Sequence, residues 1–168
     1  MVDPYTFILL TPVAVLSLWC AWTDLSRRRI PNTGVLALAA LYPVAVAAGV
    51  LPGDWWAGLA VGGCLFAIGL TGFALGAIGG GDVKLAAALG LWAGSSDLAG
   101  FVLVTALTGA VLSVLILATR NGPFGHLVAS PLRAGPQTGG RAATGESVPY
   151  GVALAAGGLW IAYGLIAA

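Results

Sequence analysis

Two aspartates, Asp24 and Asp82, could carry acid–base chemistry, because each lies at the edge of a long apolar stretch. Ionisable groups at membrane depth are costly, and by default they mark function or a specific pairing. Two carboxyl groups that approach closely cannot both ionise easily, so such a pair can share one proton. One carboxyl could then accept a proton from water while the other donates one to a carbonyl oxygen, which is chemistry that can hydrolyse a peptide bond.

Each aspartate also has a purely structural interpretation. Asp24 could pair with Arg27 or Arg28, three and four residues later, if its helix continues that far. Asp82 follows a run of glycines and could cap the helix that begins there. Both interpretations stay open on these residues alone.

The composition indicates that membrane helices must position the two aspartates. Of the 168 residues, 59% are apolar and 8% are charged, whereas a soluble domain carries about 25% charged residues. Such a chain cannot cover a water-facing surface, which excludes soluble, disordered and nucleic-acid-binding proteins. Cys20 and Cys64 lie in apolar runs without the spacing of metal ligands, and we interpret both as small buried residues.

Five apolar stretches contain no Lys, Arg, Asp or Glu and are about long enough to cross a bilayer. They are Tyr5–Thr23, Val35–Leu51, Trp55–Ile78, Leu98–Thr119 and Val148–Ala168. A sixth piece, Val83–Gly94, is shorter, and we expect a helix that its neighbours shield from lipid. The sequence therefore predicts an all-α membrane protein with six transmembrane helices, the fourth short. Residues 1–168 form one domain, with a cytoplasmic loop at about 120–147.

Glycines at a spacing of four residues predict close packing between some of these helices. The pairs are Gly58 with Gly62, Gly72 with Gly76, and Gly90 with Gly94. Small residues on one helix face let two helix backbones approach each other.

The basic residues indicate how the helices are oriented. With six crossings, all 7 Lys and Arg residues fall on one side of the membrane and none on the other. The positive-inside rule makes that side cytoplasmic and places both termini outside. Three acidic residues fall on the outer side, and three fall on the cytoplasmic side, namely Asp24, Asp82 and Glu146. The two aspartates of interest therefore share one membrane boundary.

The sequence around the two aspartates carries two motifs. Five residues separate Asp24 from Ile30-Pro31-Asn32, and Asp82 closes the run Gly79-Gly80-Gly81-Asp82, with Lys84 two places later. These motifs, their order and the two helices predicted between them resemble the type IV prepilin peptidase family, whose members are membrane aspartic peptidases with a Gly-x-Gly-Asp motif. The run Val148-Pro149-Tyr150-Gly151 is similar to the Pro-aromatic-Gly start of that family's final helix, so the resemblance covers nearly the whole chain.

The resemblance implies that Asp24 and Asp82 form the catalytic pair and that no metal or organic cofactor is needed. It implies supporting roles near the substrate or in the adjacent loops for five residues, namely Gly79, Gly81, Lys84, Pro31 and Asn32. Glycine would give the backbone close access to the substrate there. Arg27–Arg29 and Lys84 could also hold anionic membrane lipid or tune the pair, although a role as topology anchors is the simpler interpretation.

The implied substrate is a prepilin or pseudopilin with a short basic leader, a glycine before the cut and an apolar helix after it. Larger family members have a cytoplasmic insertion with paired Cys-x-x-Cys motifs and also N-methylate the new amino terminus. This sequence has no such motif, which implies a peptidase without methyltransferase activity. The short length resembles the peptidases of bacterial tight-adherence (Flp-type) pilus systems and implies a multi-pass protein of the inner membrane.

Other functions remain compatible with the same residues. A preflagellin peptidase, or another signal-processing peptidase with the Gly-x-Gly-Asp motif, would differ only in its client. A small transporter or proton-relay subunit could use Asp24 and Asp82 to carry protons or cations, although the predicted spans hold few polar groups near mid-membrane. An inactive assembly partner of a secretion system would tolerate the loss of both aspartates.

Overall fold

The computed structural model describes residues 4–51, 54–121 and 149–167, and its regular elements in these ranges are all helices. They are α1 (Pro4–Arg27), α2 (Asn32–Ala47), α3 (Trp55–Ala74), α4 (Gly80–Ala93), α5 (Leu98–Asn121) and α7 (Tyr150–Ala167). Each predicted apolar stretch corresponds to one of these helices, so the all-α prediction is confirmed. The loop predicted at about 120–147 lies outside the described residues except for its first two, which end α5.

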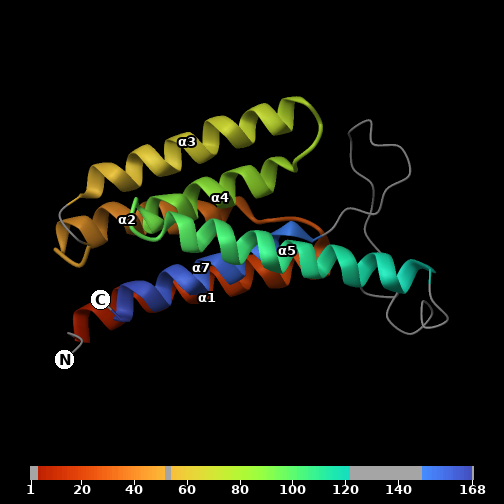
Figure 1. Ribbon diagram of the computed structural model, residues 1–168. Helices are drawn as coiled ribbons and strands as arrows, with labels where there is room; N and C mark the ends of the chain where they lie inside the picture. The colour runs from red at the N-terminus through yellow and green to blue at the C-terminus, as the bar shows by residue number, and fades with distance from the viewer. Residues whose placement is uncertain (1–3, 52–53, 122–148, 168) are drawn as a thin grey trace.

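The helices lie side by side in an elongated bundle, and their connections alternate between its two ends (Figure 1). Helix α7 packs against α1, α4 and α5, while α4 also packs against α2 and α3. The end of α1 and the start of α4 lie at one end of the bundle, whereas the start of α1 and the end of α7 lie at the other (Figure 1). The fold therefore brings the two predicted aspartates to the same end.

Helix α4 is short and enclosed, as the sequence predicts. Its 14 residues span about 21 Å, less than the roughly 30 Å of a bilayer's hydrocarbon core. Its neighbours cover it, and half of its residues are buried, namely Val83, Leu85, Ala88, Leu89, Gly90, Trp92 and Ala93. A helix that begins with a charged turn is thereby kept from lipid along most of its length.

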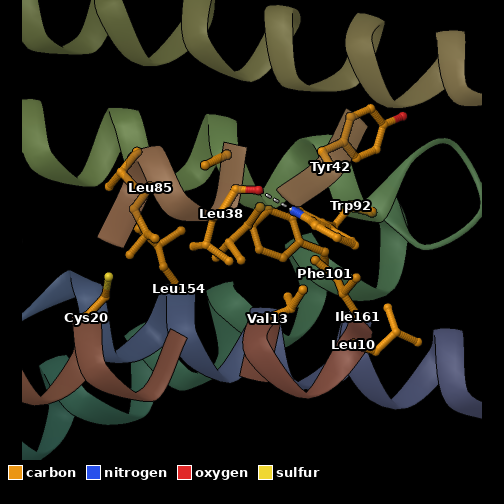
Figure 2. Close-up of a cluster of buried hydrophobic side chains, with 14 of the residues drawn as sticks. Leu10, Val13, Cys20, Leu38, Tyr42, Leu85, Trp92, Phe101, Leu154 and Ile161 are labelled. Atoms are coloured by element: carbon orange, nitrogen blue, oxygen red, sulfur yellow. Dashed lines mark hydrogen bonds between the residues drawn. The ribbon is translucent and has the colours of Figure 1, made fainter. Parts of the chain in front are cut away.

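Apolar side chains from α1, α2, α4, α5 and α7 meet in one core (Figure 2). The Trp92 indole N–H donates a hydrogen bond of 3.0 Å to the Leu38 carbonyl inside this core, which satisfies a polar group that would otherwise be buried without a partner. The Tyr42 ring meets the Trp92 ring edge to face, with 5.7 Å between centroids. These contacts join α2 to α4.

The outer faces of two helices are apolar. Helix α3 and residues Leu98–Ala118 of α5 are long and apolar enough to cross a membrane, and only 17% of each apolar window is buried inside the protein. A core helix of a soluble protein would bury most of such a stretch, whereas a surface this apolar suits lipid. The structure thus indicates a membrane protein, and the six crossings and the outward termini stay predictions.

Two details of the packing differ from the sequence-based predictions. Cys20 is buried as predicted, but Cys64 is exposed on α3, because that helix packs against α4 and leaves its other side uncovered. Gly76 and Gly94 lie beyond the ends of α3 and α4 with φ of +73° and +53°. They therefore act in turns that favour glycine rather than on a helix face.

Candidate active site

Asp24 lies in the last turn of α1, and only 8% of its surface is exposed. The helix ends with Arg28 in the left-handed conformation, at φ 52°, and the Arg28 N–H donates to the Asp24 carbonyl at 2.9 Å. This is the 5→1 bond of an αL cap, which is usually made by glycine. The bond fixes the backbone of Asp24 at the point where the chain leaves the helix.

The Asp24 side chain contacts the first turn of α7. Its Oδ2 accepts a hydrogen bond of 2.9 Å from the Gly151 N–H. A Cβ at position 151 would lie 2.8 Å from Oδ2 and 2.9 Å from Cγ of Asp24, so α7 can approach this closely only with glycine there. This contact is not predicted by the sequence. The available signal was the Pro149-Tyr150-Gly151 start of the last helix, which does not reveal what the N–H faces.

Asp82 is the third residue of α4 and is partly buried. Gly79 is the N-cap of the helix, and a backbone hydrogen bond from Gly79 acts on the Asp82 carboxyl. A carboxylate that reaches back from this position to the N-cap N–H forms one half of a capping box. The capping interpretation is therefore correct in part, because Asp82 supports the helix start without occupying the cap position itself.

The two sequence motifs meet between the start of α4 and the start of α2. A Cβ on Gly81 would lie 3.2 Å from the Cβ of Ile30, and the Lys84 ammonium donates a hydrogen bond of 3.3 Å to Oδ1 of Asn32. Pro31 is the N-cap residue of α2. Close packing within the chain is thus one reason for glycine at position 81, and contact with a substrate stays a prediction.

The charge of Asp24 acts on Asp82. Both residues lie just outside the apolar stretches, which end at Thr23 and begin at Val83. Burial, and then the negative charge of Asp24, raise the pKa of Asp82 to about 6, against the effect of the Gly79 hydrogen bond. Burial also raises the pKa of Asp24, while the Gly151 hydrogen bond and then the Arg28 charge oppose that shift. A negative charge on Asp24 therefore favours the protonated form of Asp82.

A hollow of about 470 Å³ lies at the α1–α2 junction, lined by Trp19, Trp22, Thr23, Ser26, Arg27, Arg29 and Pro31. Neither Asp24 nor Asp82 lines it, so it does not mark the position where chemistry would occur. Within the residues that the structure describes, no three His, Cys, Asp or Glu side chains come together as metal ligands.

The bond between Lys84 and Asn32 allows the interaction energy between the two motifs to be measured. Both side chains are exposed and the bond is long, so a double-mutant cycle of Lys84→Ala and Asn32→Ala should give a coupling below about 1 kcal/mol in unfolding free energy. Thr33→Ala, at the exposed neighbouring position, should add to Lys84→Ala without coupling. A coupling above about 2 kcal/mol would show that the pair is more enclosed than this.

A comparison with known families bears on the same residues. The model of the type IV leader peptidase family matches residues 12–114. The matched part is more than half of the chain and contains Asp24, Asp82 and both motifs around them. No curated protein and no solved structure matches the chain.

Proposed function

Because the chain belongs to the type IV leader peptidase family, we propose that it is a membrane aspartic endopeptidase whose catalytic pair is Asp24 and Asp82. One observation carries this proposal. The aspartates of the two motifs lie on different helices, at the same end of the bundle, and the negative charge of Asp24 reaches Asp82 and raises its pKa. Burial and mutual repulsion favour one proton on the pair, which is the state that acid–base hydrolysis needs.

The proposed reaction is hydrolysis of one peptide bond. One carboxylate takes a proton from water while the water oxygen bonds to the scissile carbonyl carbon, and the protonated carboxyl gives its proton to the carbonyl oxygen. The tetrahedral intermediate then collapses, the C–N bond breaks, and the proton taken from water passes to the leaving amine. One hydroxyl group of the intermediate gives its proton to the second carboxyl as the new C-terminal acid forms, so the pair ends in its starting state.

We further propose that the substrate is a prepilin or pseudopilin, cut at the cytoplasmic face of the bacterial inner membrane. The apolar outer faces of α3 and α5 suit a substrate helix that also lies in lipid. Such a helix would carry its leader junction to the end of the bundle where the end of α1 and the start of α4 hold the aspartates. The peptidase activity requires neither a metal nor an organic cofactor in this scheme, and no methyltransferase activity accompanies it.

Cleavage of a prepilin in a defined membrane tests this function. We expect the protein, reconstituted in lipid vesicles with a candidate prepilin, to release the leader after its last glycine, as read from the mass of the mature pilin. Vesicles without the protein give the background. Failure to cut any of several prepilins, in a preparation shown to be folded, would contradict the proposal.

The rate of cleavage should depend on pH in a defined direction. The pKa of Asp82 is raised to about 6, so the shared proton is retained below that pH and is lost as the pH rises through it. We expect kcat/KM to fall across this range, because the pair then has no proton to donate. Asp54→Asn, an exposed change at the other end of the bundle, should leave the profile unchanged. A rate that rises steadily between about pH 6 and 8 would contradict this assignment.

A further inference from the structure

The first turn of α7 reaches into the candidate site although it carries no charged residue. Its Gly151 N–H is bonded to Oδ2 of Asp24, at 2.9 Å and in a buried position. The space for a Cβ at position 151 is already taken by the Asp24 side chain. A backbone N–H cannot lose its donor character, so it is a permanent and fixed partner for one carboxylate oxygen.

We propose that Gly151 is a positioning residue that holds Asp24 ionised and oriented, which makes Asp24 the base toward water and Asp82 the carrier of the shared proton. This assignment rests on the function proposed above. Hydrogen bonding to the charged form of a carboxyl favours that form. With Oδ2 engaged by the Gly151 N–H, Oδ1 is the Asp24 oxygen that is left to accept the proton from water.

The other charged groups near Asp24 agree with this division of roles. On α1, the Arg28 charge favours the ionised form of Asp24, and the Cys20 thiol lies one turn earlier. Helices α2 and α7, which pack against α1, contain no charged side chain. Asp82 on α4 experiences the opposite effect, because the negative charge of Asp24 favours the protonated form of Asp82. Asp82 has a backbone hydrogen bond from Gly79, and within the described part of the chain no cation is among the groups that shift its pKa.

Replacing a single backbone atom tests the proposal without adding a side chain. In the first protein, glycolic acid is incorporated at position 151, so that an ester oxygen replaces the N–H that bonds to Asp24. In the matched control, 2-hydroxyisovaleric acid is incorporated at Val152, whose N–H donates only within the same helix turn, to the Pro149 carbonyl at 3.2 Å. Both proteins lose one N–H at the start of α7, but only the first loses the contact with Asp24.

Loss of the donor should make Asp24 easier to protonate. On the acidic side of the pH profile, kcat/KM falls as Asp24 becomes protonated, and we call this part the acidic limb. In the position-151 ester we expect this limb to shift to higher pH by about one to two units, so that cleavage at a given pH on it is about tenfold to a hundredfold slower. The Val152 ester should keep the limb of the natural protein. The proposal would be overturned if the acidic limb lay at the same pH in both esters. A bond with a purely structural role would affect the yield or stability of the protein and would leave the pH of this limb unchanged.

A second readout separates this inference from the proposed activity. The infrared carboxyl band of Asp24 can be titrated in an Asp82→Asn background, with the Asp24→Asn, Asp82→Asn protein subtracted. We expect the midpoint of this titration to rise in the position-151 ester and to stay in place in the Val152 ester, whether or not the protein cleaves a prepilin. An unchanged midpoint would refute the positioning role, whereas absence of cleavage by the natural protein would count against the peptidase function alone.

Discussion

Asp24→Asn and Asp82→Asn should each accumulate in the membrane at the natural level and yet leave a prepilin almost uncut, with a loss of about a hundredfold to ten-thousandfold in cleavage rate. An amide cannot take the proton from water in place of Asp24, and it cannot donate a carboxyl proton in place of Asp82. Because the two groups act as one unit, the double variant should be little slower than either single variant.

The fold is expected to survive these changes because asparagine has nearly the shape of aspartate. The amide oxygen at position 24 can still accept the Gly151 N–H, which is bonded to Oδ2 in the natural protein, and the oxygen at position 82 can still face the Gly79 N–H. Removing a buried carboxylate also removes a desolvation cost. Loss of activity with normal accumulation would thus point to chemistry rather than to folding.

Matched aspartates elsewhere in the chain provide the control for these variants. Asp54→Asn and Asp97→Asn make the same chemical change at the other end of the bundle and should leave cleavage intact. The measurement is the mass of the pilin after co-expression with each variant. Complete processing by Asp24→Asn or by Asp82→Asn would remove that residue from the catalytic pair.

Much of the site could be predicted from the sequence because lipid imposes simple rules on it. Apolar stretches of sufficient length gave the helices, and counting their connections placed Asp24 and Asp82 at one end, where the structure also has them. The prediction put the two motifs at one membrane boundary without saying that they touch. In the structure Gly81 lies against Ile30, and Lys84 donates a hydrogen bond to Asn32.

The contact between α7 and Asp24 could not be predicted in the same way. In a helix such as α7, the side chains are apolar on every face, so polarity does not reveal which face packs against α1 or at what register. The bond from Gly151 to Asp24 depends on that register. The exposure of Cys64 on α3 has the same explanation, since a lipid-facing side is as apolar as a buried one.

Gly58→Ala should destabilise the protein by about 2–4 kcal/mol, from overpacking of about 1–3 kcal/mol and the loss of one hydrogen bond. A Cβ on Gly58 would collide with the Leu91 carbonyl of α4 and with the Tyr42 hydroxyl. The Leu91 carbonyl belongs to a helix backbone and cannot move cheaply. The Tyr42 hydroxyl is held by its 2.7 Å bond to the Trp55 carbonyl, so it cannot give way without losing that bond.

Gly63→Ala is the matched control on the same helix, because nothing lies within 4 Å of the Cβ that it would add. It should leave stability unchanged or raise it by up to about 1 kcal/mol, since alanine favours a helix over glycine. The measurement is the free energy of unfolding, or the melting temperature, of the two proteins in the same detergent. Equal stabilities would show that α3 does not approach α4 at Gly58.

The same pair of variants tests how the scaffold supports the chemistry. Helix α3 packs along α4 and reaches the site end at Gly69, where an added Cβ would lie 2.8 Å from Cγ1 of Val83, the residue after Asp82. Gly58 lies at the other end of this interface, in the first turn of α3. We therefore expect Gly58→Ala to reduce the amount of folded protein while each folded molecule cleaves at the natural rate. A lower rate per folded molecule would show instead that α3 transmits the disturbance along α4 to Asp82.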